Sequence, residues 1–124
     1  MAVTYKGGNT THSNPNAENW TVTVAIASGT LSDAFHLPGI VAFVDIGATG
    51  TAGRTLTLQR LETDGSTFVD TELTFTTLDD EAATSRWTSE QLAPYAGLFG
   101  KYENLKLKLS ASDSVTVIFH CTRA

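Results

Sequence analysis

Residues 104–122, NLKLKLSASDSVTVIFHCT, alternate apolar and polar side chains through two successive runs. In the first run Leu105, Leu107 and Leu109 share one face, with lysines between them. Because successive side chains of a strand point to opposite sides, each run predicts a strand with one buried face. The polar stretch ASDS at 111–114 predicts a turn between the two strands. The apolar face of the second run holds Val115, Val117, Phe119 and Cys121.

The segments before this region repeat the same alternation. Residues 20–27, WTVTVAIA, predict a half-buried strand, which Ser28 and Gly29 are expected to close. Residues 33–37, DAFHL, predict a short strand ahead of a Pro-Gly turn. Residues 40–47, IVAFVDIG, are apolar on both faces except at Asp45, which is the pattern of a central strand.

A hairpin is predicted between residues 58 and 75, LQRLETDGSTFVDTELTF, because two strand-like runs flank Asp64-Gly65. Its second strand places Val69, Leu73 and Phe75 on an apolar face, and the acidic side chains point the other way.

The alternation of apolar residues is irregular in the first strand of this hairpin. Leu56 and Leu58 share a face, whereas Leu61 has the opposite parity. A bulge near Gln59 or Arg60 would reconcile the two sets, because an extra residue shifts the alternation by one.

The pattern as a whole predicts an all-β fold, an antiparallel β-sandwich or jelly roll of about seven or eight strands. Residues 1–19 are rich in Gly, Asn, Thr and Ser, and we expect them to form an extended N-terminal arm. Residues 20–124 are expected to form a single β-sandwich domain. Between the strands, Ser89 is expected to cap a short helical turn.

Composition narrows the class of protein. The chain has 124 residues, of which 41% are hydrophobic, 17% are charged and twenty are threonine. A net charge of −5 argues against binding nucleic acid, because phosphates require clustered cations. No apolar run is long enough to span a bilayer, and the N-terminus lacks the apolar core of a signal peptide. A single cysteine allows no internal disulfide, and we expect folding in a reducing cytoplasm.

No motif predicts a reaction. His12, His36 and His120 lie far apart in sequence, which does not favour a metal site. His120 and Cys121 are adjacent on a strand and face opposite sides, so they cannot act as base and nucleophile for each other. Residues 79–81, DDE, are interpreted as a solvated loop, with a calcium site as the alternative. We therefore expect a non-enzymatic protein without a metal or a cofactor.

Charge is distributed unevenly along the chain. Residues 62–90 hold eight acids and Arg86 as their one base, whereas residues 101–108 hold three lysines and one acid. Opposite patches of this kind can dock neighbouring copies head to tail, although ordinary charge scatter gives the same pattern. The candidate interface residues are Tyr5, Lys6, Trp87, Tyr95, Lys106 and Lys108.

Three stretches together resemble a known group of proteins: SGTLSDAFHLPG (28–39), TLTLQRLETDGSTFVDT (55–71) and FGKYENLKLKLSASDSVTVIF (99–119). They are similar to small β-sandwich virion proteins of tailed phages, of the head decoration or capsid auxiliary type. This resemblance implies a structural protein that folds in the host cytoplasm, joins the virion and stabilises the head lattice. The implied partners are the major capsid protein or other virion subunits, with a homo-oligomer, such as a trimer, as the assembled form.

Three alternatives stay open. A tail or fibre component would use the same sandwich elsewhere on the virion. A carbohydrate-binding module would need an exposed aromatic row, for which Trp87, Tyr95 and Tyr102 are the candidates. A small hydrolase would need a concave pocket that joins an acid of residues 79–81 to a histidine.

Overall fold

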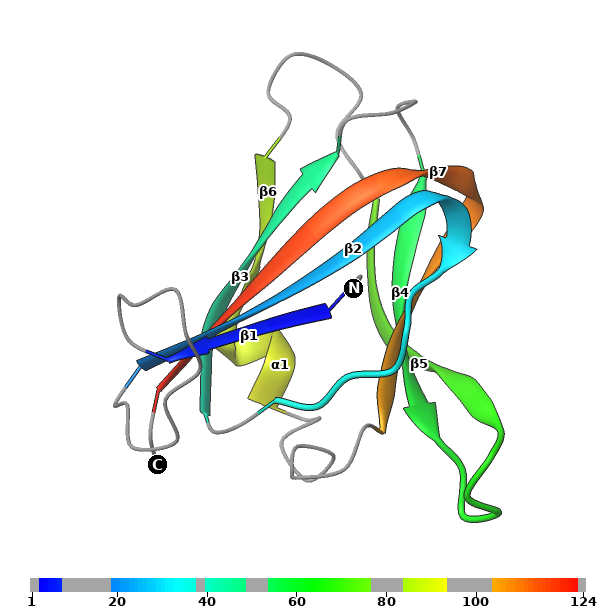
Figure 1. Cartoon of the computed structure of the whole chain (residues 1–124), viewed down its shortest axis with the longest axis horizontal. Coiled ribbons are helices and arrows are strands. Elements are labelled where there is room, and N and C mark those ends of the chain that lie inside the picture. Colours follow the sequence, from blue (N-terminus) through cyan, green and yellow to red (C-terminus); the bar gives the residue numbers. More distant parts are fainter. Residues whose placement is uncertain are drawn as a thin grey trace.

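The computed structural model describes residues 3–7, 19–37, 40–48, 54–76, 84–93 and 104–122. In these ranges seven antiparallel strands form one open sheet, accompanied by one short helix (Figure 1). None of the described helical residues belongs to a helix long and apolar enough to cross a membrane. The strands are β1 (Val3–Gly7), β2 (Asn19–Leu31), β3 (Ile40–Ala48), β4 (Thr55–Leu61), β5 (Phe68–Thr76), β6 (Thr84–Thr88) and β7 (Leu105–Thr122), and the helix is α1 (Ser89–Leu92).

Strand β7 organises the sheet because it pairs with different neighbours along its length. Leu105–Leu109 pair with β4, and Val115–Thr122 pair with β2 on one side and β3 on the other. The turn expected at residues 111–114 is therefore wrong: the chain bends there and continues as one strand of 18 residues. Figure 1 shows β7 rising beside β4, bending, and returning across the molecule beside β2 and β3.

The bend divides the sheet into two parts. The larger part has the order β1-β2-β7-β3-β6, which confirms that residues 40–47 lie in an internal strand. The smaller part consists of β5, β4 and the first half of β7. Each of β1, β5 and β6 pairs with a single neighbour among the described strands, so these three form the edges of the sheet.

Both parts bury apolar side chains in one hydrophobic cluster. The predicted alternation is confirmed along β7, where every second residue from Leu105 to Leu109 and from Val115 to Cys121 is buried. The rings of Phe35 and Phe119 meet in this cluster with their centroids 5.2 Å apart. The largest buried side chains include Trp87, Phe35, Phe119, Leu37, Ile46, Leu56, Leu58, Leu92, Leu105 and Leu107.

The N-terminal residues do not form a separate arm where the structure describes them. Residues 3–7 form edge strand β1, which pairs with β2 from Val3↔Val24 to Gly7↔Trp20. Val3 is buried in the core, and its burial explains why this end of the chain joins the sheet. Residues 8–18 lie outside the described part of the chain.

Strand β2 does not end at Ser28 and Gly29, as the sequence predicted, but continues to Leu31. Ser28 adopts a left-handed backbone conformation with a φ of 52°, and its N–H donates a hydrogen bond to Ser114 Oγ. The register against β7 shifts at this position. The polar Ser-Gly pair therefore marks a bulge, because a left-handed residue can bend a strand without ending it.

The helical turn is capped one residue earlier than expected. Thr88 Oγ1 accepts a hydrogen bond from the Gln91 N–H, and the Gln91 side-chain oxygen accepts one from the Thr88 N–H. This reciprocal pair is a capping box, so Thr88 rather than Ser89 is the N-cap of α1.

The β4–β5 hairpin is confirmed, and Asp64 fixes its turn. Asp64 Oδ1 accepts hydrogen bonds from the N–H groups of Ser66 and Thr67, and Oδ2 accepts one from Thr67 Oγ1. Gly65 has a φ of +80°, a conformation that favours glycine. The irregularity expected in β4 lies instead on β5: β4 runs in regular register with β7, and the extra residues fall between Asp70 and Thr74.

The Asp64 turn predicts a specific acid sensitivity. These three hydrogen bonds lower the pKa of Asp64 from 3.8 to about 2, so the folded state favours the carboxylate. The resulting stabilisation is complete above the unfolded pKa and is lost as the pH falls from about 4 to about 2.

Urea unfolding of wild type and Asp64→Asn at several pH values tests this dependence. We expect wild type to be the more stable at pH 5 and the gap to narrow towards pH 2. A gap that does not change with pH would show that the charge of Asp64 does not stabilise the turn. Asp70 titrates in both proteins and therefore cancels in the comparison.

Candidate functional site

The smaller part of the sheet presents a polar outer surface that we call the β4–β5–β7 face. It is the side opposite Leu56, Leu58 and the buried leucines of β7. Cross-strand register places Gln59 beside Lys106 on one side and Asp70 on the other. The face is defined by Gln59 on β4, Phe68 and Asp70 on β5, and Lys106 and Lys108 on β7.

Asp70 joins the three strands of this face. Its Oδ2 lies 2.6 Å from Lys108 Nζ, and its Oδ1 accepts a hydrogen bond of 2.9 Å from Gln59 Nε2. The Lys108 hydrogen bond and then the Gln59 hydrogen bond lower the pKa of Asp70, which keeps the carboxylate charged. Because Lys108 and Asp70 are both accessible to solvent, this pair sets the geometry of the face more than its stability.

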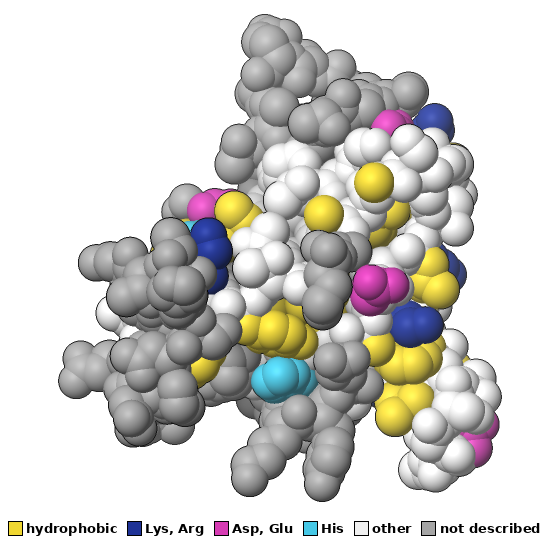
Figure 2. Space-filling model, viewed as in Figure 1, with side chains coloured by type: hydrophobic (Ala, Val, Ile, Leu, Met, Phe, Trp, Pro, Cys, Tyr) yellow, Lys and Arg dark blue, Asp and Glu magenta, His cyan; other side chains and the backbone are white. Residues whose placement is uncertain are grey.

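Lys106 and Gln59 complete the face. The Lys106 ammonium lies 4.6 Å from the centroid of the Phe68 ring, a cation–π contact that holds an apolar ring and a charge together. Gln59 is only 8% exposed, and its Oε1 has no hydrogen-bond partner among the described residues. On the side of the molecule seen in Figure 2, charged side chains of both signs likewise lie beside apolar ones.

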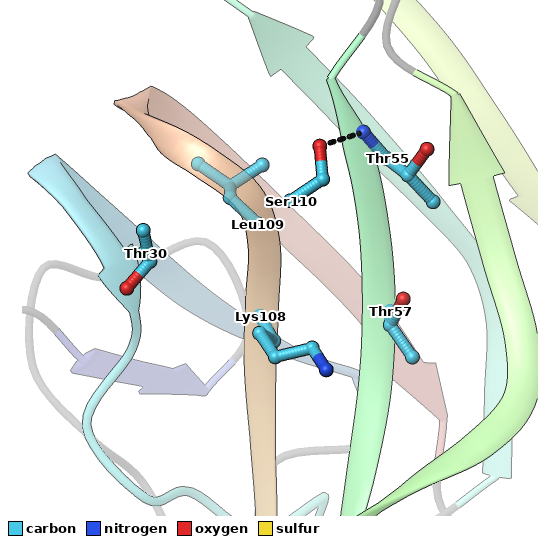
Figure 3. A pocket seen from close by; sticks show the side chains of 6 residues that line it. All are labelled: Thr30, Thr55, Thr57, Lys108, Leu109 and Ser110. Carbon is cyan, nitrogen blue, oxygen red and sulfur yellow. Dashed lines mark hydrogen bonds between the residues drawn. The ribbon is translucent and has the colours of Figure 1, made fainter.

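A pocket of about 430 Å³ adjoins this face. Three strands supply its lining: Thr30 from β2, Thr55 and Thr57 from β4, and Lys108, Leu109 and Ser110 from β7 (Figure 3). Ser110 Oγ accepts a hydrogen bond of 3.0 Å from the Thr55 N–H. The lining contains no aromatic ring, whereas pockets for small molecules and cofactors are mainly apolar and aromatic. This chemistry suits polar contacts with a partner surface.

The structure does not bring the candidate interface residues together on one surface. Lys106 and Lys108 lie side by side on the β4–β5–β7 face. Lys6 is exposed on β1, and its neighbour Tyr5 is half-buried, where its hydroxyl accepts a hydrogen bond of 3.2 Å from the His36 N–H. Tyr95 lies outside the described residues.

Trp87, a candidate both for the interface and for the exposed aromatic row, is buried in the core. Trp87 is 0% exposed, because its register partner Val44 belongs to the inward side of β3. Its indole N–H has no hydrogen-bond partner among the described residues. An aromatic platform for sugars cannot include this buried ring.

Cys121 and His120 lie on opposite sides of the sheet. Cys121 is buried, and desolvation raises the pKa of its thiol to about 12. His120 lies on the opposite side, where its Nε2 is 3.2 Å from Asp45 Oδ2 and its ring stacks on Phe43 at 4.2 Å. The prediction that His120 and Cys121 face opposite sides is confirmed, and they form no nucleophile–base pair.

No metal-binding group emerges where the chain is described. No three His, Cys, Asp or Glu side chains come together in these ranges. The pocket lining contains neither a histidine nor a carboxylate. The acidic residues 79–81, on which the calcium and hydrolase alternatives depended, lie outside the described residues.

The sequence analysis missed three residues of the candidate face: Gln59, Phe68 and Asp70. The alternation along β5 did place Asp70 on the polar side of the hairpin. Only the pairing of β4 with β7, which are far apart in sequence, brings these residues to Lys106 and Lys108.

Comparison with known proteins gives a single result. No protein-family model, no curated protein and no solved structure matches the chain. The interpretation of its function therefore depends on its own residues.

Proposed function

We propose that this protein is a non-enzymatic structural component of a virion, most specifically a capsid decoration protein that binds and stabilises the head lattice. The proposal combines the resemblance of three sequence stretches to tailed-phage virion proteins with the surface of the smaller part of the sheet. Its partners would be the major capsid protein or other virion subunits, including further copies of this chain. A tail or fibre component would use the same kind of surface at another place on the particle.

The observation on which the proposal rests is the open edge of β5 beside the β4–β5–β7 face. β5 has nine residues and pairs only with β4 among the described strands. An open strand edge offers main-chain hydrogen bonds to a partner, and side chains beside it provide specificity. Here Lys106, Phe68 and Asp70 supply a cation, an aromatic ring and an anion next to that edge.

The bent sheet also supports a finer proposal for the architecture. Leu58 of the smaller part and Val117 of the larger part belong to the same hydrophobic cluster. We infer that the two parts of the sheet act as the two layers of a β-sandwich, with β7 passing from one layer to the other. A body of this kind is rigid enough to bridge subunits of a shell.

The carbohydrate-binding alternative finds less support. Its aromatic row loses Trp87, which is buried, and the described pocket offers hydroxyls without a ring for a sugar to stack on.

Particles purified from the virus that encodes this chain provide the test. We expect the chain to sediment with the major capsid protein in a fixed ratio and to rebind to stripped particles. Finding the chain only in the soluble fraction would overturn the virion proposal.

Two matched variants then locate the binding surface. Lys106→Glu reverses a charge on the β4–β5–β7 face, and Glu90→Lys reverses an exposed charge on α1, in the other part of the molecule. We expect Lys106→Glu to weaken rebinding by about tenfold and Glu90→Lys to leave it nearly unchanged. Equal effects, or a larger effect of Glu90→Lys, would show that the binding surface lies elsewhere.

A further inference from the structure

Strand β1 joins the edge of the sheet through a short run of residue pairs with one neighbouring strand. It pairs with β2 through five residue pairs and with no other described strand. Val3 enters the core, and the Tyr5 ring stacks on His36 with centroids 4.7 Å apart. Because β2 and His36 follow each other closely in the chain, one copy of residues 19–37 presents both the strand that pairs with β1 and the ring that stacks on Tyr5.

The connection between β1 and β2 is longer than their pairing needs. Gly7 pairs with Trp20, so the two strand ends lie next to each other. Two residues suffice to join antiparallel neighbours, yet residues 8–18, GNTTHSNPNAE, provide eleven. Eleven residues can span up to about 36–40 Å, several times the spacing of about 4.8 Å between strands. This length lets β1 reach a strand of another molecule.

We propose that β1 is an exchangeable strand: in the assembled protein, Val3–Gly7 of one copy pairs with β2 of a second copy of this chain. The same hydrogen bonds, the same Val3 burial and the same Tyr5–His36 stacking form in either arrangement. The exchange therefore costs mainly the entropy of association. A lattice that holds copies close together raises their effective concentration and offsets this cost.

The exchange extends the proposed function, because a swapped strand would link neighbouring copies into a continuous layer. It can nevertheless be tested on the purified chain alone. A failure of the exchange would leave the virion proposal standing, and a failure to find the chain on particles would leave the exchange standing.

Disulfide trapping between two singly substituted chains tests the proposal. Thr4 and Thr23 are directly opposite in the β1–β2 register, at a Cα separation that a disulfide can bridge. Chains with Thr4→Cys and chains with Thr23→Cys are mixed at high concentration in a glutathione redox buffer. We expect a covalent heterodimer, because the strand of the first chain can pair with β2 of the second. The native Cys121 is buried with a raised pKa and should not react.

Two controls make each outcome decisive. Thr116, on β7, pairs with Ala25 and lies away from β1, so Thr4→Cys mixed with Thr116→Cys measures random collision. We expect the Thr4–Thr23 heterodimer to exceed this background roughly tenfold. The double variant Thr4→Cys/Thr23→Cys should close its disulfide within one chain, which verifies the register. A heterodimer yield equal to background, or a double variant that stays reduced, would overturn the proposal.

Discussion

Replacing Phe119 with alanine should lower the free energy of unfolding by about 3–5 kcal/mol. Phe119 is 0% exposed, and its neighbours in the sheet are Val22 on β2 and Val44 on β3. Its ring also packs against Phe35, which belongs to the segment after β2. Truncation removes this apolar contact area and leaves a cavity that the paired strands around it cannot close.

Phe43→Ala is the matched control for this prediction, and urea unfolding followed by tryptophan fluorescence is the measurement. Phe43 is half-buried on the opposite side of the sheet, where its ring stacks on His120. Because water already reaches this ring, we expect its removal to cost clearly less than that of Phe119. If Phe119→Ala does not fold, Phe119→Leu provides a smaller cavity for the same comparison. Equal costs at positions 43 and 119 would contradict the assignment of the core side.

Replacing Ser32 with alanine should cost about 1–3 kcal/mol of stability, a large effect for the loss of one oxygen atom. Ser32 is 5% exposed and lies where the chain leaves β2. Its Oγ accepts a hydrogen bond of 2.9 Å from the Leu107 N–H and donates one of 2.8 Å to the Asp33 carbonyl. Without the hydroxyl, a buried N–H of β7 loses its acceptor.

Ser110→Ala is the control for this prediction, because it removes a serine hydroxyl that accepts an exposed backbone N–H instead of a buried one. Ser110 Oγ also accepts a backbone N–H, that of Thr55, but this hydrogen bond is exposed. Water can replace the hydroxyl there, so we expect a change within about 0.5 kcal/mol. Urea unfolding of both variants gives the free energies, and hydrogen exchange at the Leu107 amide should accelerate in Ser32→Ala alone. Similar losses in the two variants would contradict the role of burial.

How well the sequence predicts each feature of this fold depends on how far apart in sequence the interacting residues are. The alternation along residues 104–122 correctly predicts which side chains are buried, because side-chain direction in a strand repeats every two residues. The same residues mislead at 111–114, where serines and an aspartate indicated a turn. There Arg54, the residue before β4, forms an ion pair of 3.3 Å with Asp113, and Ser114 Oγ accepts a hydrogen bond from the Ser28 N–H. Contacts with distant segments let a turn-like sequence continue as a bent strand.

The β4–β5–β7 face also combines features that the local sequence predicts with others that only long-range pairing decides. The acidic side of β5 and the lysines of β7 are each visible in the sequence as local alternation. The sequence does not show that these two sets of side chains meet, because the register of β4, β5 and β7 is set by pairing between residues up to about fifty positions apart. The sequence also left the side taken by Trp87 open, because the five residues of β6 are too few to give a clear alternation.

The sequence by itself determined most of the strand-forming runs, their buried sides and the Asp64-Gly65 hairpin, because each depends on residues within a few positions of one another. The strand predicted at residues 33–37 is wrong, since only Phe35 forms an isolated bridge there, with Leu105. The tertiary structure decided that β7 is a single bent strand shared by two parts of the sheet, that β1 joins the sheet and that Lys106 and Lys108 lie beside Asp70. These features depend on hydrogen bonds and burial between distant segments, and they form only when the whole chain is paired.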